Sequence, residues 1–126
     1  MDEQRFEEGL RIRREVLGAE RVERAYDHAD DFNRPFQEFM TEYCWGACWG
    51  RPGLDKKTRS MLNLIMLVAL NRRDEFKLYV GGALENGVSE AEIQEILIQA
   101  AVYCGIPAAV SAFKDASEVL AAKRAG

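Results

Sequence analysis

Two residues in the middle of the chain, Tyr79 and Glu75, have the types and spacing needed to move a proton. Residues four apart in a helix lie on one face, so the Tyr79 hydroxyl would stand one turn beyond the Glu75 carboxylate. A tyrosine shielded from water beside a carboxylate or an arginine can donate a proton to a reacting group. The alternative is that Tyr79 packs in the core with its hydroxyl hydrogen-bonded, and the sequence leaves both open.

Four arginines bracket the apolar segment Met61–Leu70, which precedes this pair. A guanidinium is planar and can bind a carboxylate through two parallel hydrogen bonds, so these arginines are candidates for holding an acidic substrate. Charged residues near helix ends are also commonly solvated or ion-paired, and that alternative stays open for each of them. The candidate substrate-binding arginines are Arg51, Arg59, Arg72 and Arg73.

Two tryptophans and two cysteines occur in one short segment, each pair at a spacing of four. Trp45 and Trp49 place two large rings on one helix face, where they would either wall a pocket or pack in a core or subunit interface. Cys44 and Cys48 lie near the end of that helix, where the helix dipole disfavours a thiolate, so a structural role is predicted for both. Cys104 is predicted to be buried filler.

Composition limits the classes of protein to which the chain can belong. Its 126 residues carry a net charge of -4 with a pI of about 5.1, which fits one domain and disfavours nucleic-acid binding. The apolar run is too short to span a bilayer and the first residues are highly charged, so we expect no membrane segment, no signal peptide and a cytoplasmic location. Three cysteines argue against a disulfide framework. The single histidine, His28, is expected at the surface or at a helix end.

The elements that position these residues read as helices throughout, because no stretch shows the alternating pattern of a strand. Helix ends are marked by glycines, a proline and a Ser-x-x-Glu capping box. These signals fall at Gly18, Gly87, Gly105, Pro107 and Ser89. The predicted helices cover roughly 3–17, 20–28, 33–48, 56–71, 74–85, 89–104 and 107–123.

We therefore predict an all-α fold of six or seven helices in a single domain, 1–126. The helix at 56–71 is apolar nearly all round in its middle, which predicts that it is the central, buried helix. Asp55 is expected to cap that helix and Asp74 the next one. The last two helices are rich in small residues, which fits either a homo-oligomer or close packing within one chain.

The order of motifs along nearly the whole chain resembles the 4-carboxymuconolactone decarboxylase family. The most specific blocks are Arg51-Pro52-Gly53-Leu54-Asp55 and the segment from Tyr103 to Phe113. The resemblance implies an alkylhydroperoxidase-like all-α fold with a buried central helical hairpin. It also implies a ring-shaped homo-oligomer, a hexamer or a trimer, and catalysis without a cofactor.

The activity implied is decarboxylation of 4-carboxymuconolactone, or of a related carboxylated lactone, to an enol-lactone in the breakdown of aromatic acids. Loss of carbon dioxide sends the electron pair into the conjugated lactone, and protonation of the resulting anion gives the enol-lactone. Such a site needs cations for the acidic arm, donors for the lactone oxygen and a source of the proton. In this chain Arg51, Arg59 and either Arg72 or Arg73 would hold carboxylates. The two tryptophans would wall the pocket, and Tyr79 with Glu75 would handle the proton.

The chain departs from the family pattern at the reacting position. Tyr79 stands where the family has a histidine, Ala47 replaces a glutamate, and Lys114 replaces a second histidine. The ordinary pKa of tyrosine is about 10, which makes it a poor base at neutral pH. Two alternatives therefore stay open: a lyase or isomerase acting on a different lactone, and a non-catalytic oligomeric binding protein.

The thiol peroxidases that share this fold are a less favoured alternative. That branch uses a CxxC dithiol, a histidine four residues after it and an upstream glutamate. The corresponding positions here are Arg72, Glu75, Tyr79 and Ser60, and none of them carries the required residue.

Overall fold

The structure is a computed structural model that describes residues 1–126. It contains seven α-helices, one π-helical segment and no strands, which confirms the predicted all-α fold. The chain divides into two compact units, Met1–Lys56 and Lys57–Gly126. The prediction that one domain spans 1–126 stays a prediction. None of the helices combines the length and the apolar character needed to cross a membrane.

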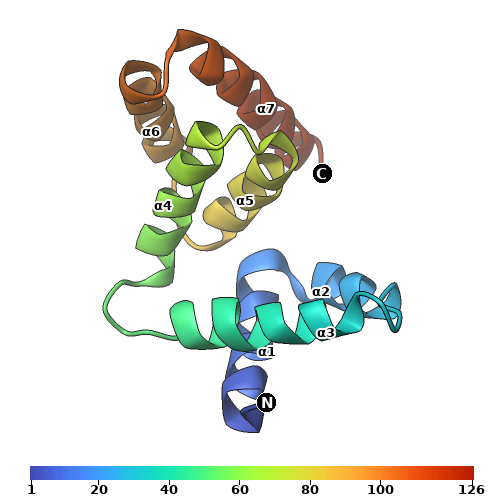
Figure 1. The fold of residues 1–126 in the computed structure, drawn as a ribbon. Helices are drawn as coiled ribbons and strands as arrows, with labels where there is room; N and C mark the ends of the chain where they lie inside the picture. Colours follow the sequence, from blue (N-terminus) through green and yellow to red (C-terminus); the bar gives the residue numbers. More distant parts are fainter. The chain divides into compact units, whose positions relative to one another are not determined.

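The first unit contains three α-helices and the π-helical segment. These elements are α1 (Glu3–Leu17), α2 (Ala19–Asp27), α3 (Arg34–Phe39) and η1 (Met40–Cys48). Figure 1 shows α3 running on into η1 as one rod that lies across α1. The predicted helix at 33–48 is therefore present, but its second half is π-helical. Its end has the wider hydrogen bond of a π-helix, from the Trp49 N–H to the Cys44 carbonyl at 3.1 Å.

Two glycines allow α1 and η1 to cross at close range. A Cβ added to Gly9 would lie 2.0 Å from the Thr41 carbonyl oxygen, and one added to Gly46 would lie 2.3 Å from the Arg5 carbonyl oxygen. The atoms in the way belong to the backbone, which cannot rotate aside as a side chain can. Only glycine fits at these two positions, so the two rods meet backbone to backbone. The large apolar side chains buried in this unit are Ile12, Val16, Val22, Trp45 and Trp49.

The second unit contains the four remaining helices. They are α4 (Lys56–Ala69), of which the first residue belongs to the first unit, α5 (Arg73–Glu85), α6 (Glu90–Tyr103) and α7 (Ile106–Ala125). The predicted capping box is confirmed, because the Ser89 hydroxyl accepts from the Glu92 N–H at 3.0 Å and the Glu92 carboxylate accepts from the Ser89 N–H at 2.9 Å. The prediction that Asp74 caps α5 is wrong. The helix starts at Arg73, and Asp74 lies in its first turn.

One apolar cluster forms the core of the second unit, and all four of its helices contribute to it. Leu64 of α4, Val80 of α5 and Leu97 of α6 are fully buried in it, and α7 adds small residues that let it approach closely. Helices α4 and α5 thus contribute to the core together with α6 and α7. The prediction that α4 is the central, buried helix holds for one face of the helix only, the face that carries Leu64 and Val68. On the opposite face of α4, Leu62 is 43% and Met66 is 49% exposed, and Leu70, just after the helix, is 68% exposed.

Candidate functional site

Helix α5 brings together three of the candidate residues. Arg72, the residue before the helix, donates from Nη2 to the Glu75 carboxylate at 2.5 Å. Tyr79 follows Glu75 by four residues, so it occupies the next turn of the same face. It is half-buried and packs against the apolar core of the second unit. The structure therefore aligns Arg72, Glu75 and Tyr79 along one side of α5.

The pairing with Arg72 determines what Glu75 can do chemically. The hydrogen bond from Arg72 holds the pKa of Glu75 below its ordinary value, and a backbone hydrogen bond lowers it further. Glu75 is thus a carboxylate at neutral pH and can accept a proton or a hydrogen bond, but it has no proton to give. Of the predicted proton-handling pair, Tyr79 is the residue with a donor.

Arg73 contacts a residue that the sequence analysis missed, Asp115 of α7. Its Nε and Nη2 each donate to the Asp115 carboxylate at 2.9 Å, and Asp115 is only 1% exposed. Lys77 lies 3.9 Å from the same carboxylate and 3.1 Å from Glu118. This bidentate contact occupies the donor edge that a substrate carboxylate would need, so Arg73 links α5 to α7. Any contact of Arg73 with a substrate would have to use Nη1.

Asp115 is a titratable group on which the stability of the second unit depends. The hydrogen bonds from Arg73 hold the pKa of Asp115 below its ordinary value, against the opposing effect of burial, and Lys77 and Lys114 lower it further. The folded-state pKa therefore lies below the unfolded value of about 3.9, so the carboxylate stabilises the fold above that pH. The stabilisation is lost as the pH falls through the folded-state pKa. The sequence did contain a signal: Asp115 falls on the stripe of buried small residues formed by Ala109, Ala112 and Ala116.

The two tryptophans pack against each other in the core of the first unit. Their ring centroids are 4.9 Å apart, and Trp45 and Trp49 are 1% and 6% exposed. This burial favours the core-packing alternative over an open pocket wall. Of the other predicted residues, Arg51 lies in the exposed segment after η1 and Arg59 is half-buried on α4. Their substrate-binding roles stay predictions.

None of the cysteines forms a disulfide. Burial of the sulfur raises the pKa of Cys44 although the residue as a whole is exposed, and the neighbouring Cys48 raises it further. The Cys44 thiol is therefore not activated as a nucleophile. Cys104 is half-buried against the core of the second unit. His28 ends α2 and is exposed, as predicted.

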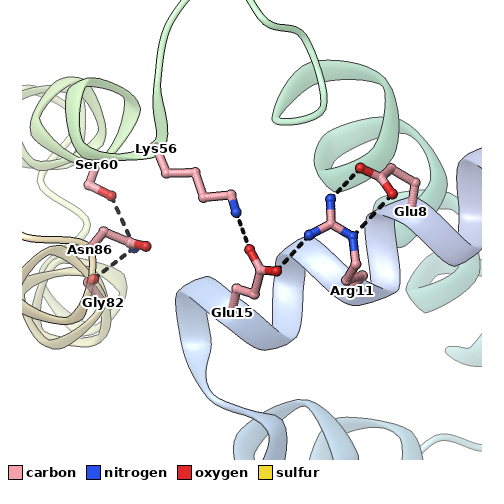
Figure 2. Close-up of polar contacts among 7 residues, drawn as sticks. All are labelled: Glu8, Arg11, Glu15, Lys56, Ser60, Gly82 and Asn86. Atoms are coloured by element: carbon pink, nitrogen blue, oxygen red, sulfur yellow. Dashed lines mark hydrogen bonds and ion pairs between the residues drawn. The ribbon is translucent and has the colours of Figure 1, made fainter.

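Figure 2 shows two sets of polar contacts, one in each unit. In the second unit, Asn86 Nδ2 donates to the Gly82 carbonyl at 2.8 Å and to the hydroxyl of Ser60 at 3.4 Å, which ties the end of α5 to α4. Ser60 is 1% exposed, so this is a buried polar contact. In the first unit an exposed chain of ion pairs joins three residues of α1 to Lys56, and it adds little stability because water screens exposed charges. Its members are Glu8, Arg11, Glu15 and Lys56.

Two surface hollows, one in each unit, are lined by other residues than the candidates. The hollow in the second unit lies between α6 and α7 and has a volume of about 330 Å³, with Ile93 and Leu97 among its apolar lining and Gln94 and Ser117 among its polar lining. The hollow in the first unit is lined mainly by charged residues of α1. No cluster of three or more His, Cys, Asp or Glu side chains has a metal-binding arrangement.

Comparison with known proteins shows which family the chain resembles along most of its length. The model of the carboxymuconolactone decarboxylase family matches residues 34–118, which extend from α3 into α7. The chain is 41% identical over 118 residues to a 4-carboxymuconolactone decarboxylase of Acinetobacter baylyi, which covers 94% of this chain and 88% of the relative. It is also 48% identical over 107 residues to a nitrosuccinic acid decarboxylase of Metarhizium robertsii, which covers 85% of this chain and 75% of the relative. The chain belongs to the carboxymuconolactone decarboxylase family.

Proposed function

We propose that the protein is a carboxy-lyase that decarboxylates a small acidic substrate without a cofactor, and that 4-carboxymuconolactone or a related carboxylated lactone is this substrate. The observation that carries the proposal is the 41% identity, along nearly the whole chain, to a protein named for this reaction. A substrate of this kind contains its own electron sink. The protein then has to bind the acid, exclude water and supply a proton.

The residues of α5 have chemical properties that suit these steps. The bond between the substrate and its carboxylate breaks, carbon dioxide leaves, and the electron pair moves into the conjugated lactone. The Tyr79 hydroxyl then donates the proton, or stabilises the lactone oxygen while a proton reaches the carbon from water. The Glu75 carboxylate, held by Arg72, accepts a hydrogen bond or a proton beside Tyr79. One proton is consumed for each carbon dioxide released, so no redox partner is needed.

A second candidate substrate is favoured by one specific observation. The relative with 48% identity is named for a substrate that is not a lactone, nitrosuccinic acid. In such a compound the nitro group would take the electron pair released with carbon dioxide, and the carbon would be protonated afterwards. The demands on the protein are the same as for the lactone. Tyr79, which replaces the histidine of the family pattern, is the position at which a change of substrate is expected to be visible.

The test is release of carbon dioxide by the purified protein, measured with 4-carboxymuconolactone and with nitrosuccinate in parallel against the spontaneous reaction. We expect release above background with at least one of the two. Tyr79→Phe removes only the hydroxyl, so kcat should fall at least about tenfold, within the range attributed to a positioned acid or base. Tyr43→Phe is the matched control, because Tyr43 is a partly exposed tyrosine of the first unit, and this variant should retain wild-type turnover.

Two results would count against the proposal. If neither substrate yields carbon dioxide above the spontaneous rate, the protein is not a decarboxylase of these acids and the non-catalytic alternative gains support. If turnover occurs but Tyr79→Phe leaves kcat unchanged, the proton role of Tyr79 is wrong. Tyr79→His is a further variant. If it turns over the lactone faster than wild type does, the wild-type site is adapted to a substrate other than the lactone.

We also propose that the protein acts as a homo-oligomer. A group of large apolar side chains around the turn between α6 and α7 is open to solvent, including Val102 at 76%, Tyr103 at 82% and Ile106 at 65% exposed. Exposed apolar groups of this kind commonly mark contact surfaces between protein chains. Self-association into a closed ring, a trimer or a hexamer, would cover such a surface in every copy.

A further inference from the structure

Arg13, in the first unit, is a buried arginine that has no carboxylate partner. The residue is 6% exposed, and its side chain makes one hydrogen bond, from Nη1 to the Thr41 hydroxyl at 3.1 Å. Its guanidinium also lies over the ring of Tyr26, 5.8 Å from the centroid. Its Nε is buried and has no hydrogen-bond acceptor in the protein.

An arrangement of this kind is costly for a folded protein. A guanidinium keeps its charge in proteins, so Arg13 cannot escape burial by losing a proton. Buried charges are normally paired, and buried N–H groups normally have acceptors. The nearby residue Glu42 is also buried at 5% exposure, but its carboxylate accepts from the Asp2 N–H at 2.9 Å and forms no ion pair with Arg13. No carboxylate of its own unit therefore pairs with Arg13, whose contacts are the Thr41 hydroxyl and the Tyr26 ring.

Another arginine of the same protein shows what the unused donor can bind. Arg73 holds the carboxylate of Asp115 with its Nε and Nη2, at 2.9 Å each. The Nε of Arg13 belongs to the same edge of the guanidinium, and that edge matches the two oxygens of a carboxylate. Arg73 finds its carboxylate within the chain, whereas the corresponding donor of Arg13 has none.

The surroundings of Arg13 contain further polar groups suited to a ligand. The Tyr26 hydroxyl is 2.7 Å from the Thr41 hydroxyl and 3.4 Å from the Gln37 carbonyl oxygen. Thr41 belongs to η1, and π-helical segments are rare and frequently occur at functional sites. The Thr41 and Tyr26 hydroxyls thus surround Arg13 with polar groups, while the Arg13 Nε is left without an acceptor.

We infer that Arg13 is the anchor of a carboxylate-binding site in the first unit. The ligand is a small organic acid, because an arginine with 6% exposure is accessible only to a small group and its free donor edge fits a planar carboxylate better than a tetrahedral anion. The Thr41 hydroxyl positions the guanidinium from the opposite side. The site rests on these contacts alone and does not depend on the decarboxylase reaction.

The test is ligand-dependent thermal stability, with succinate as the probe because it is a small dicarboxylate without an electron sink. The Tm of the wild-type protein should rise with the logarithm of succinate concentration above the dissociation constant, as binding to the folded state requires. Arg13→Met keeps most of the side-chain volume and removes the charge, and it should abolish the rise. Arg14→Met is the matched control, since Arg14 is the exposed neighbour on α1, and it should retain the rise.

Three further arms make the test specific. Succinamide, which is neutral, and sulfate at matched ionic strength should give no rise that depends on Arg13. Arg13→Lys keeps the charge but loses the two-donor edge, so succinate should bind at least about tenfold more weakly, the loss expected for one charge-assisted hydrogen bond. If Arg13→Met fails to fold, Arg13→Lys takes its place in the comparison with wild type.

The inference would be overturned by an equal rise in wild type, Arg13→Met and Arg14→Met, or by no rise in wild type. It would also be overturned if Arg13→Met changed only the dependence of Tm on protein concentration, because a second copy of the chain would then supply the carboxylate. The proposed decarboxylase activity is unaffected by any of these results, since succinate binding is measured without turnover.

Discussion

Replacing Gly9 with alanine sets two effects of opposite sign against each other. In the middle of a helix, alanine is favoured over glycine by about 0.5–1 kcal/mol, because glycine loses more backbone freedom on folding. Without other contacts, Gly9→Ala would therefore stabilise α1. In the structure, however, the added Cβ would meet the Thr41 carbonyl oxygen at 2.0 Å and the Gly46 nitrogen at 2.7 Å.

The clash should outweigh the gain in helix propensity. Carbon and other heavy atoms in contact normally lie about 3.5–4.0 Å apart, so α1 and η1 would have to separate by more than 1 Å. Overpacking of this kind typically costs about 1–3 kcal/mol, and the upper end applies here because both obstacles are backbone atoms. With about 1 kcal/mol returned by helix propensity, we expect a net loss of about 2 kcal/mol and a Tm lower by roughly 6–10 °C.

The assay can follow the affected unit directly, because both tryptophans of the protein, Trp45 and Trp49, lie beside this crossing in the first unit. Urea unfolding monitored by tryptophan fluorescence should show a lower midpoint for Gly9→Ala. The matched control is Gly81→Ala on α5, where an added Cβ meets nothing within 4 Å and only the helix propensity changes. Far-UV circular dichroism should show Gly81→Ala to be as stable as wild type or more so. A stabilised Gly9→Ala would refute the close crossing of α1 and η1.

Two further predictions concern the second unit. Arg73→Met should lower the urea midpoint at pH 7, because it leaves the buried Asp115 carboxylate with Lys77 at 3.9 Å as its nearest cation. The difference in midpoint between the variant and wild type should shrink below about pH 4, where Asp115 becomes protonated. Arg72→Met is the control, since Arg72 pairs only with the partly exposed Glu75, and a difference that did not change with pH would contradict the role given to Asp115. Val102→Asp, which places a charge in the exposed apolar group around the α6–α7 turn, should shift the protein toward the monomer in light scattering. A wild-type protein that is already monomeric at micromolar concentration would contradict the homo-oligomer.

Much of the fold could be predicted because helix ends carry local chemical signals. Gly18, Gly87 and Gly105 have φ values of 93°, 93° and 102°, and each ends or separates helices where the sequence placed a boundary. The capping box at Ser89 depends on residues three apart and is equally local. Asp74 was misplaced because an acidic residue suits both the cap and the first turn of a helix, and sequence alone does not distinguish the two.

The features that were missed depend on contacts between distant parts of the chain. The π-helical geometry of η1 has no local signal comparable to a cap. Arg13 and Asp115 both occupy positions on the buried stripe of their helices, at the spacing of apolar neighbours. A charged residue on such a stripe is a usable signal of a buried polar contact, but its partner lies 28 residues away for Arg13 and 42 residues away for Asp115. The partners could therefore not be named from spacing within a helix.

The π-helical geometry of η1 has a consequence for comparing this chain with its relatives. In a π-helix each backbone hydrogen bond joins residues five apart, whereas in an α-helix it joins residues four apart. Each hydrogen-bonded ring of the π-helix therefore contains one residue more. Deleting a single residue within 40–48 would return the segment to α-helical spacing. The side chains before and after the deletion could then stay on the same sides of the helix as before. A relative one residue shorter here would thus be expected to keep the crossing with α1, and a single-residue gap inside η1 would then mark a change of helix type. Correspondence across Thr41, Trp45 and Trp49 should be assigned from the crossing with α1, and not by counting residues from Arg51.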